Sequence, residues 1–450
     1  MKSWNAAPVT RARRDVSLAD PGVRGYALAV VRFLAPAYLR WGVGCRRVRV
    51  IHPENLVTPF ASALDGKTKL IIAFRHPFVD EPQILSWLFF RGIRHEARRL
   101  KTQLPRAPHA VFVHGYEVPR WSGALVRWIM PRLGAMPVHH SKMDSNGISR
   151  IRRAIIDGGY PVALAPEGQV GYSSETVPRL ESGALRLGYE AASMMNAAGR
   201  NEPVVVLPLS VHRRYRGRRP RVALERLIRR TEKTIGIDLP ATRSSAIAAR
   251  LNDACDRILG RAEALYLIPA EPDLDRDSRV ARVVVAAVTA GERILGIPKG
   301  HGEIIERVYR IRQIGWDRIY VSGDPGHLTP LDRAIADRAA GEAWYAMRHM
   351  ELADFAWYFR TTVPAPDAPF HSVVEYAQNL WDFANRLAGG AISGRVTVRP
   401  FDALIVAGTP LDLTARMDEY RSGKKAAVAR ALDDLKMEYE RCIEEARLER

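Results

Sequence analysis

Short apolar runs that alternate with helix-like segments restrict the fold of this 450-residue chain most strongly. Each run has the length of a buried strand and ends in proline, glycine or polar residues. The strand-like segments occupy residues 46–51, 67–76, 134–140, 160–168 and 202–212. Segments with helical spacing lie between them, for example at 81–101 and 146–159. Buried strands that alternate with helices predict an α/β fold, a sheet flanked by helices.

The pattern changes after about residue 222, where the segments become amphipathic at helical spacing. A chain of this length favours two domains, or one large domain with an extension. We therefore predict a polar tail at 1–24, frayed over residues 1–20, and an α/β domain at 25–265 that begins with a membrane-associating helix. A linker-like stretch follows, and then a mainly helical C-terminal domain at 278–450. The last region has no segment with the spacing of a catalytic motif, so the sequence leaves its role open.

Positive charge is concentrated in the first part of the chain. Residues 1–270 hold 43 Lys and Arg against 21 Asp and Glu, a net charge of +22, whereas residues 271–450 hold 25 against 28, a net charge of −3. A basic first part indicates an anionic partner, which could be a nucleic acid, an anionic membrane surface or a phosphorylated substrate.

The cysteines and the apolar stretches exclude several classes of protein. Cys45, Cys255 and Cys442 lie far apart, without the spacing of a metal site or a disulfide framework, which fits a reducing compartment. His139 and His140 have no third ligand at metal-like spacing, so we expect no metal. The first residues lack the pattern of a signal peptide. No run of about 18 charge-free apolar residues is present, which argues against a transmembrane helix.

Residues 25–44 form the most apolar helical segment, but Arg32, Pro36 and Arg40 interrupt it. The two arginines lie on one side of a helix. The apolar side carries Leu28, Val31, Leu34, Tyr38 and Trp41. Such a helix suits a membrane interface, and it equally suits packing on the protein core. The Trp- and Tyr-containing stretch 111–130 has the same two interpretations.

The segment FRHPFVDEPQIL, residues 74–85, places His76 at the end of a predicted strand. Asp80 follows it by four residues and Glu81 by five. A catalytic histidine needs a partner that fixes its tautomer and stabilises the imidazolium formed on proton abstraction. Either carboxylate can reach Nδ1 across a turn and leave Nε2 for a substrate hydroxyl. The other interpretation is a structural histidine at a strand end.

A second segment, residues 163–191, joins a Pro-Glu-Gly turn to a polar loop and a helix. Together, HPFVDEP (76–82) and PEGQ with LESGALRLG, about 90 residues further on, resemble the motifs of the glycerolipid acyltransferase superfamily. Its members include lysophosphatidate and glycerol-3-phosphate acyltransferases. LGAMPVHH (133–140) and VVVLPLSV (204–211) resemble its second and fourth motifs, and VRVIHPENL (48–56) the strand that precedes the first. The resemblance covers about residues 25–265.

The resemblance implies a glycerolipid-acyltransferase-like sheet flanked by helices, with His76 as general base. The family's acidic partner falls at Glu81, with Asp80 one residue early, so either acid is a candidate. Glu167, Gly168 and Gln169 would shape the acceptor pocket.

This chain departs from the family where the acceptor phosphate is expected to bind. The arginine of the second motif aligns with His140, and the Thr-Arg after Pro-Glu-Gly is Gln169-Val170. We therefore predict that His140 lies in the acceptor site. A phosphate would need other cations, for which Arg75, Arg213 or Arg214 are candidates.

The resemblance, together with the basic first part of the chain, therefore implies a membrane-associated O-acyltransferase. An acyl-CoA or acyl-carrier protein would be the donor, and a lysolipid such as 1-acyl-glycerol-3-phosphate the acceptor, with no further cofactor. We expect peripheral or monotopic attachment to anionic lipids at the cytoplasmic face of the membrane. A catalytically silent lipid-binding or scaffold relative is the alternative. A nucleic-acid-binding protein is a lesser one, because the basic segment 212–221 accompanies neither zinc spacing nor an RNA-binding aromatic motif.

Overall fold

A largely parallel sheet forms the centre of one of two compact units in the computed structural model, which describes residues 7–139, 144–237, 246–271, 273–298, 302–390 and 392–449. The sheet unit comprises residues 18–216 and 400–450. Its strands are β2 (Cys45–Ile51), β3 (Lys69–Phe74), β4 (Val111–Gly115), β5 (Met136–Val138), β6 (Val162–Leu164), β7 (Val204–Arg214), β9 (Phe401–Ala407) and β10 (Leu411–Asp412). The order is β2-β9-β7-β3-β6-β4-β5, and β10 pairs with β7.

Strand β3 lies between β6 and β7 and is parallel to both. Ile71 is level with Val162 on one side, and Ile72 is level with Leu207 on the other. The pairs β7–β9 and β7–β10 are antiparallel. The parallel strands β3, β4, β5 and β6 therefore end at one edge of the sheet, where ligand sites of α/β proteins gather.

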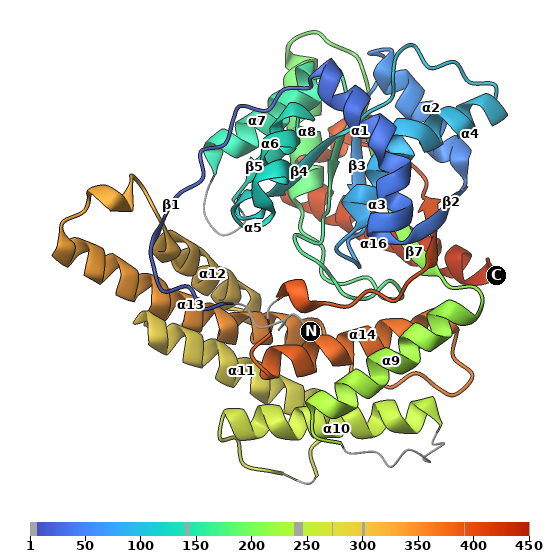
Figure 1. Cartoon of the computed structure of the whole chain (residues 1–450). Helices are drawn as coiled ribbons and strands as arrows, with labels where there is room; N and C mark the ends of the chain where they lie inside the picture. The colour runs from blue at the N-terminus through green and yellow to red at the C-terminus, as the bar shows by residue number, and fades with distance from the viewer. Residues whose placement is uncertain are drawn as a thin grey trace. The chain divides into compact units, whose positions relative to one another are not determined.

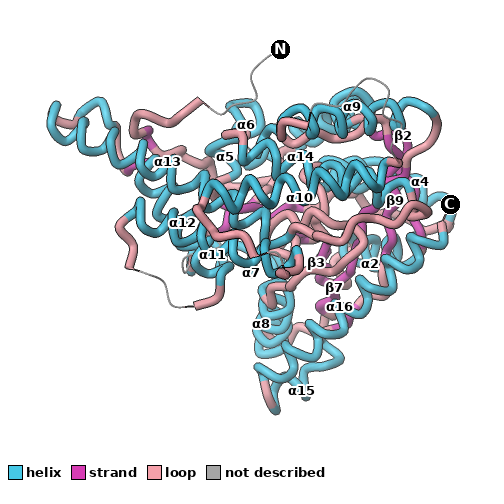
Figure 2. The backbone as a smooth tube through the Cα atoms, turned by 90° about the horizontal axis from the view of Figure 1, so that it is seen from below, coloured by secondary structure: helices cyan, strands magenta, loops and turns pink. Residues whose placement is uncertain are grey.

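Helices cover both faces of this sheet (Figures 1 and 2). One group is α1 (Gly25–Ala37), η1 (Tyr38–Val43), α2 (Pro53–Leu64), α3 (Glu81–Trp87), η2 (Leu88–Gly92) and α4 (Ile93–Arg99). The other elements are α5 (Val118–Trp121), α6 (Gly123–Arg132), α7 (Ser145–Asp157), α8 (Gly183–Ala197), η5 (Thr414–Arg416), α15 (Met417–Ser422) and α16 (Lys424–Leu448).

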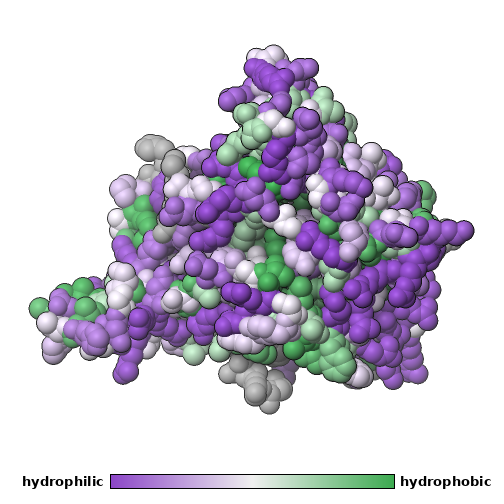
Figure 3. All heavy atoms as spheres, turned by 90° about the horizontal axis from the view of Figure 1, so that it is seen from above, coloured by the Kyte–Doolittle hydropathy of each residue, from purple (hydrophilic) through white to green (hydrophobic). Residues whose placement is uncertain are grey.

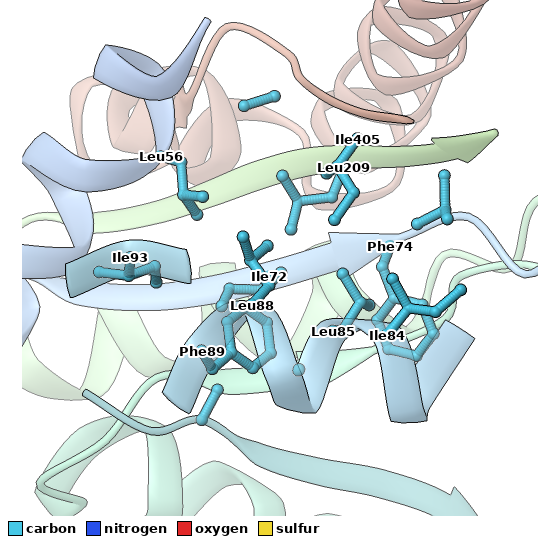
Figure 4. Close-up of a cluster of buried hydrophobic side chains, with 14 of the residues drawn as sticks. Leu56, Ile72, Phe74, Ile84, Leu85, Leu88, Phe89, Ile93, Leu209 and Ile405 are labelled. Atoms are coloured by element: carbon cyan, nitrogen blue, oxygen red, sulfur yellow. The ribbon is translucent and has the colours of Figure 1, made fainter. Parts of the chain in front are cut away.

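The alternation of side chains along β3 produces two cores. Ile72 and Phe74 join the cluster formed with η1 to α4, of which Figure 4 shows a part. Ile71 and Ala73 join the cluster formed with α7, α8, α15 and α16. A strand buried on both faces explains why residues 70–74 form a continuous apolar run.

The second compact unit is helical and comprises residues 1–17 and 217–399. Its elements are β1 (Arg13–Arg14), α9 (Arg218–Thr234), α10 (Ile247–Leu265), α11 (Arg276–Leu295), α12 (Ile304–Ile319), β8 (Tyr320–Val321), η3 (Pro325–His327), α13 (Pro330–Tyr358), α14 (Phe370–Leu387) and η4 (Ile392–Gly394). Ion pairs such as Arg307–Glu292, at 2.7 Å, are buried between its helices. Most of this unit is inserted in the sequence between β7 and β9.

The α/β class and the helical character of the later part of the chain are confirmed, but the units follow other boundaries than the predicted domains. Residues 401–407 form a strand inside the sheet, and α16 packs on it. Helices α9 and α10 belong to the helical unit. The predicted frayed tail is also a misinterpretation for residues 13–14, because β1 pairs with β8.

Candidate functional site

His76 lies two residues beyond β3, at the edge where the parallel strands end. Its Nδ1 is 2.7 Å from Oε2 of Glu81, the first residue of α3. The other carboxylate oxygen of Glu81 accepts a hydrogen bond from the backbone N–H of Phe78. The Glu81 side chain is fully buried and that of His76 is 20% exposed. The carboxylate is therefore held on both oxygens, and Nε2 is left for a further partner.

Asp80 has a different partner. Its carboxylate accepts a hydrogen bond from Nη2 of Arg213, and both side chains are largely buried. The Arg213 guanidinium lies over the ring of Phe78 at 3.9 Å and that of Phe401 at 4.4 Å. The structure therefore separates the two candidate acids, with Glu81 on the imidazole and Asp80 on the guanidinium.

Glu167 approaches the same edge from the end of β6 and pairs with Arg75. Arg75 Nε donates to Glu167 Oε1 at 3.1 Å, and neither side chain is exposed by more than 1%. Gly168 follows in the left-handed region, with φ +71°, where a turn returns its N–H to the Ala165 carbonyl at 3.2 Å. This conformation favours glycine, which explains the Pro-Glu-Gly sequence.

Burial and the charges at this edge shift the pKa values of His76 and Glu81. Burial lowers the pKa of His76, but the hydrogen bond and charge of Glu81, with the charges of Glu167 and Asp80, outweigh it and raise the pKa above the ordinary value. Burial raises the pKa of Glu81 to about 7, although His76 opposes that shift. Since the two groups interact strongly, they titrate as a pair.

The structure brings together only some of the predicted site residues. His76, Glu81, Asp80, Arg75, Glu167 and Arg213 form one connected cluster. Gly168 and Gln169 follow in the adjoining loop, where both are partly exposed. His140 lies outside the described residues.

Arg75 and Arg213, predicted as possible phosphate ligands, have protein partners in the structure. Both side chains are buried, with exposures of 0% and 3%, and each is already bound to a protein carboxylate. Arg214 donates to the carbonyls of Arg213 and Ala446. Each of these three guanidinium groups therefore donates to an acceptor within the protein.

Sequence reasoning missed an aromatic stack at the ends of β4 and β5. The rings of Tyr116 and His139 are stacked with centroids 4.1 Å apart, and the Arg120 guanidinium lies 5.3 Å from the Tyr116 ring centroid. Pairing of β4 with β5, which places Gly115 level with Val138, brings these residues together, and no local motif signals it.

Among the residues that the structure describes, no three His, Cys, Asp or Glu side chains are grouped so that they could hold a metal ion. In the same part of the chain, no helix combines the length and the apolar character needed to cross a membrane.

Comparisons with known protein families, with curated proteins and with solved structures find no match to this chain. The chemistry of the site must therefore be argued from its own residues.

Proposed function

We propose that the sheet unit is an O-acyltransferase that moves a fatty acyl group from an acyl thioester to a lipid hydroxyl. The observation that carries this proposal is the 2.7 Å contact between His76 and the buried Glu81 at the strand edge. Nε2 takes the proton of the acceptor hydroxyl, and Glu81 stabilises the resulting imidazolium. The hydroxyl oxygen attacks the thioester carbonyl, the ester forms as the C–S bond breaks, and the imidazolium returns the proton to the leaving thiolate.

The burial of the three cysteines favours transfer of the acyl group directly from the donor to the acceptor, without an acyl-cysteine intermediate. Cys45, Cys255 and Cys442 are all buried, and none is a residue of the His76 cluster described above. Burial raises the pKa of Cys45 to about 12 and that of Cys442 to about 12, which disfavours a thiolate nucleophile. A covalent acyl-enzyme on cysteine is therefore not part of the proposal.

The acceptor is proposed to be a glycerol-based lysolipid such as 1-acyl-glycerol-3-phosphate, and the donor acyl-CoA or an acyl-carrier protein. Because Arg75 and Arg213 are buried and paired, they offer little support for a phosphomonoester. Lysolipids with neutral or sugar head groups are therefore the second class of acceptor to test.

The experiment is a matrix of donors and acceptors with the purified protein, read by mass spectrometry of the lipid products. Donors are acyl-CoA and acyl-carrier protein, and acceptors are lysophosphatidate, glycerol 3-phosphate and lysolipids with neutral or sugar head groups. A new ester with any pair supports the proposal. Lipid binding without ester formation in the whole matrix would instead support the catalytically silent alternative.

An exposed aromatic surface supports membrane association of the sheet unit. On α1 and η1, Phe33 is 77% and Trp41 76% exposed, and on α6 Leu125 is 75% exposed. The two helices are joined by Tyr26, whose hydroxyl accepts from Arg132 Nε at 3.0 Å. Figure 3 shows that hydrophobic patches interrupt a mostly hydrophilic surface. Exposed Trp and Tyr among arginines suit the interface of an anionic bilayer.

Replacing Phe33 and Trp41 together by serine should lower co-sedimentation with anionic vesicles severalfold. Binding of the native chain should rise with anionic lipid content and fall with salt, since exposed charges are screened over about 10 Å at 0.1 M. Leu331→Ser, at a side chain 70% exposed on α13, is the matched control. Equal binding by native chain and double variant would contradict this location of the surface.

The pH dependence of transfer should report the His76–Glu81 pair. His76 must be neutral to act as base, so kcat/KM should fall as pH drops through its raised pKa, above the ordinary 6.5. Glu81→Gln removes the largest influence that raises this pKa, so the acid limb should move to lower pH. The measurement is kcat/KM against pH for both proteins, and coincident midpoints would contradict the assignment.

A further inference from the structure

The loop that follows β6 carries the candidate acceptor residues, yet residues 167–176 form no helix or strand. Contacts with other parts of the molecule must therefore hold this loop in one conformation. Arg75 is among the largest fully buried side chains of the described residues. Besides the Glu167 carboxylate, its guanidinium donates to the carbonyls of Ser174 at 2.9 Å, Ser173 at 2.9 Å and Thr176 at 2.6 Å.

Two further contacts hold the same loop. The Gly171 N–H donates to the His76 carbonyl at 2.9 Å, which joins the loop to the backbone of the proposed base. On the other side, Arg447 of α16 donates to the Glu175 carboxylate at 2.8 Å. Helix α16 is itself fixed to β3, because the Tyr439 hydroxyl donates to the Ala73 carbonyl at 2.9 Å.

We propose that Arg75 is a positioning residue whose guanidinium holds the 167–176 loop in place beside His76. Arg447 stabilises the same loop from the surface of the protein. The proposal rests on the proposed function, since the loop matters for rate only if His76 is the base. The Arg75 side chain is fully buried, and its guanidinium is bound to the Glu167 carboxylate and to three loop carbonyls. Arg75 therefore acts on the reaction through the loop and does not contact the acceptor.

A guanidinium suits this position better than an ammonium group. Its planar fork reaches one carboxylate and three carbonyls at once, whereas a lysine offers a single nitrogen on a flexible stem. Glu167 balances the buried charge. Arg75→Lys should therefore keep the positive charge but lose most of the hydrogen bonds to the loop carbonyls. Arg75→Met should lose both the charge and these hydrogen bonds.

The test combines hydrogen exchange of the loop with steady-state kinetics of the full chain. In Arg75→Lys, amides of residues 167–176 should exchange faster, and kcat/KM should fall roughly 10- to 100-fold, because misplacement by about 1 Å can cost 10²-fold. Arg421→Ala is the control, since Arg421 is 57% exposed and pairs only locally with Asp418. Native exchange and native kcat/KM in Arg75→Lys would overturn the proposal.

The pH profile separates positioning from a general loss of stability. Glu167 faces Arg75, His76 and the Tyr439 hydroxyl, and His76 faces Glu81, Glu167 and Asp80. Without a cation, buried Glu167 should become neutral and cease to raise the pKa of His76. The acid limb of kcat/KM should then move to lower pH in Arg75→Met and less so in Arg75→Lys. Coincident limbs in native chain and Arg75→Met would overturn the coupling.

If the Arg75 variants fail to fold, Arg447→Ala, near the exposed end of α16, tests whether contacts to the loop affect the rate. It should speed exchange of residues 171–176 and lower kcat/KM severalfold, and unchanged values in both would overturn the proposed support. The native chain could form no ester with any donor while loop exchange is still faster in Arg75→Lys or Arg447→Ala. That result would contradict the proposed acyl transfer but still support the role of Arg75 and Arg447 in holding the loop.

Discussion

Replacing His76 by alanine is expected to lower the turnover of acyl transfer by at least about 10²-fold, because a positioned general base contributes about 10²–10⁴. The substrates should still bind, since the imidazole is one of several groups at the strand edge. The measurement is kcat with saturating donor and acceptor, made on protein whose far-UV circular dichroism matches that of the native chain.

His76→Ala also leaves the buried Glu81 carboxylate with one partner fewer, so loss of rate must be separated from loss of structure. His76→Asn keeps a hydrogen-bonding side chain toward Glu81 and removes the base, and should lose the same rate. His95→Ala, at an exposed histidine on α4, should keep native turnover. Native turnover in His76→Asn would show that the imidazole is not the base.

Glu81→Gln and Asp80→Asn should affect different properties of the protein: the first lowers the rate and the second lowers the stability. Glu81→Gln should lower kcat by roughly 10²-fold, as expected when general base catalysis is impaired, because an amide cannot stabilise the imidazolium. Asp80→Asn should change kcat far less, because its carboxylate faces Arg213.

Asp80→Asn should instead lower the free energy of unfolding by about 3–5 kcal/mol, the usual cost of leaving a buried charge without its partner. Urea unfolding of both variants beside the native chain measures this. If only Asp80→Asn loses kcat strongly, and its stability is native, then Asp80 and not Glu81 is the acid that assists His76.

Local sequence was sufficient to predict much of the sheet and the position of His76 at a strand end, close to two acidic residues. The apolar runs at 70–74, 162–164 and 204–211 are strands because both faces of this sheet are covered, which removes the need for polar alternation. The choice between Asp80 and Glu81 stayed open in the sequence. In the structure, Glu81 begins α3, and its carboxylate contacts both the imidazole and the Phe78 N–H, whereas the Asp80 carboxylate contacts Arg213.

Long-range pairing was beyond the sequence. Strand β9 lies between β2 and β7 although most of the helical unit separates it from β7 along the chain, and its short apolar run was surrounded by helical patterns. The arginines show a second limit. Counting cations near the motifs suggested phosphate ligands, whereas burial and pairing with Glu167 and Asp80 give Arg75 and Arg213 structural partners.

The most direct test of the central claim is the stoichiometry of thiol release and ester formation by the native chain and His76→Asn. With an acyl thioester and an accepted lysolipid, the native chain should release one thiol for each lipid ester formed, and His76→Asn should reduce both together. Thiol release without a matching lipid ester, or equal ester formation by the two proteins, would contradict acyl transfer by His76.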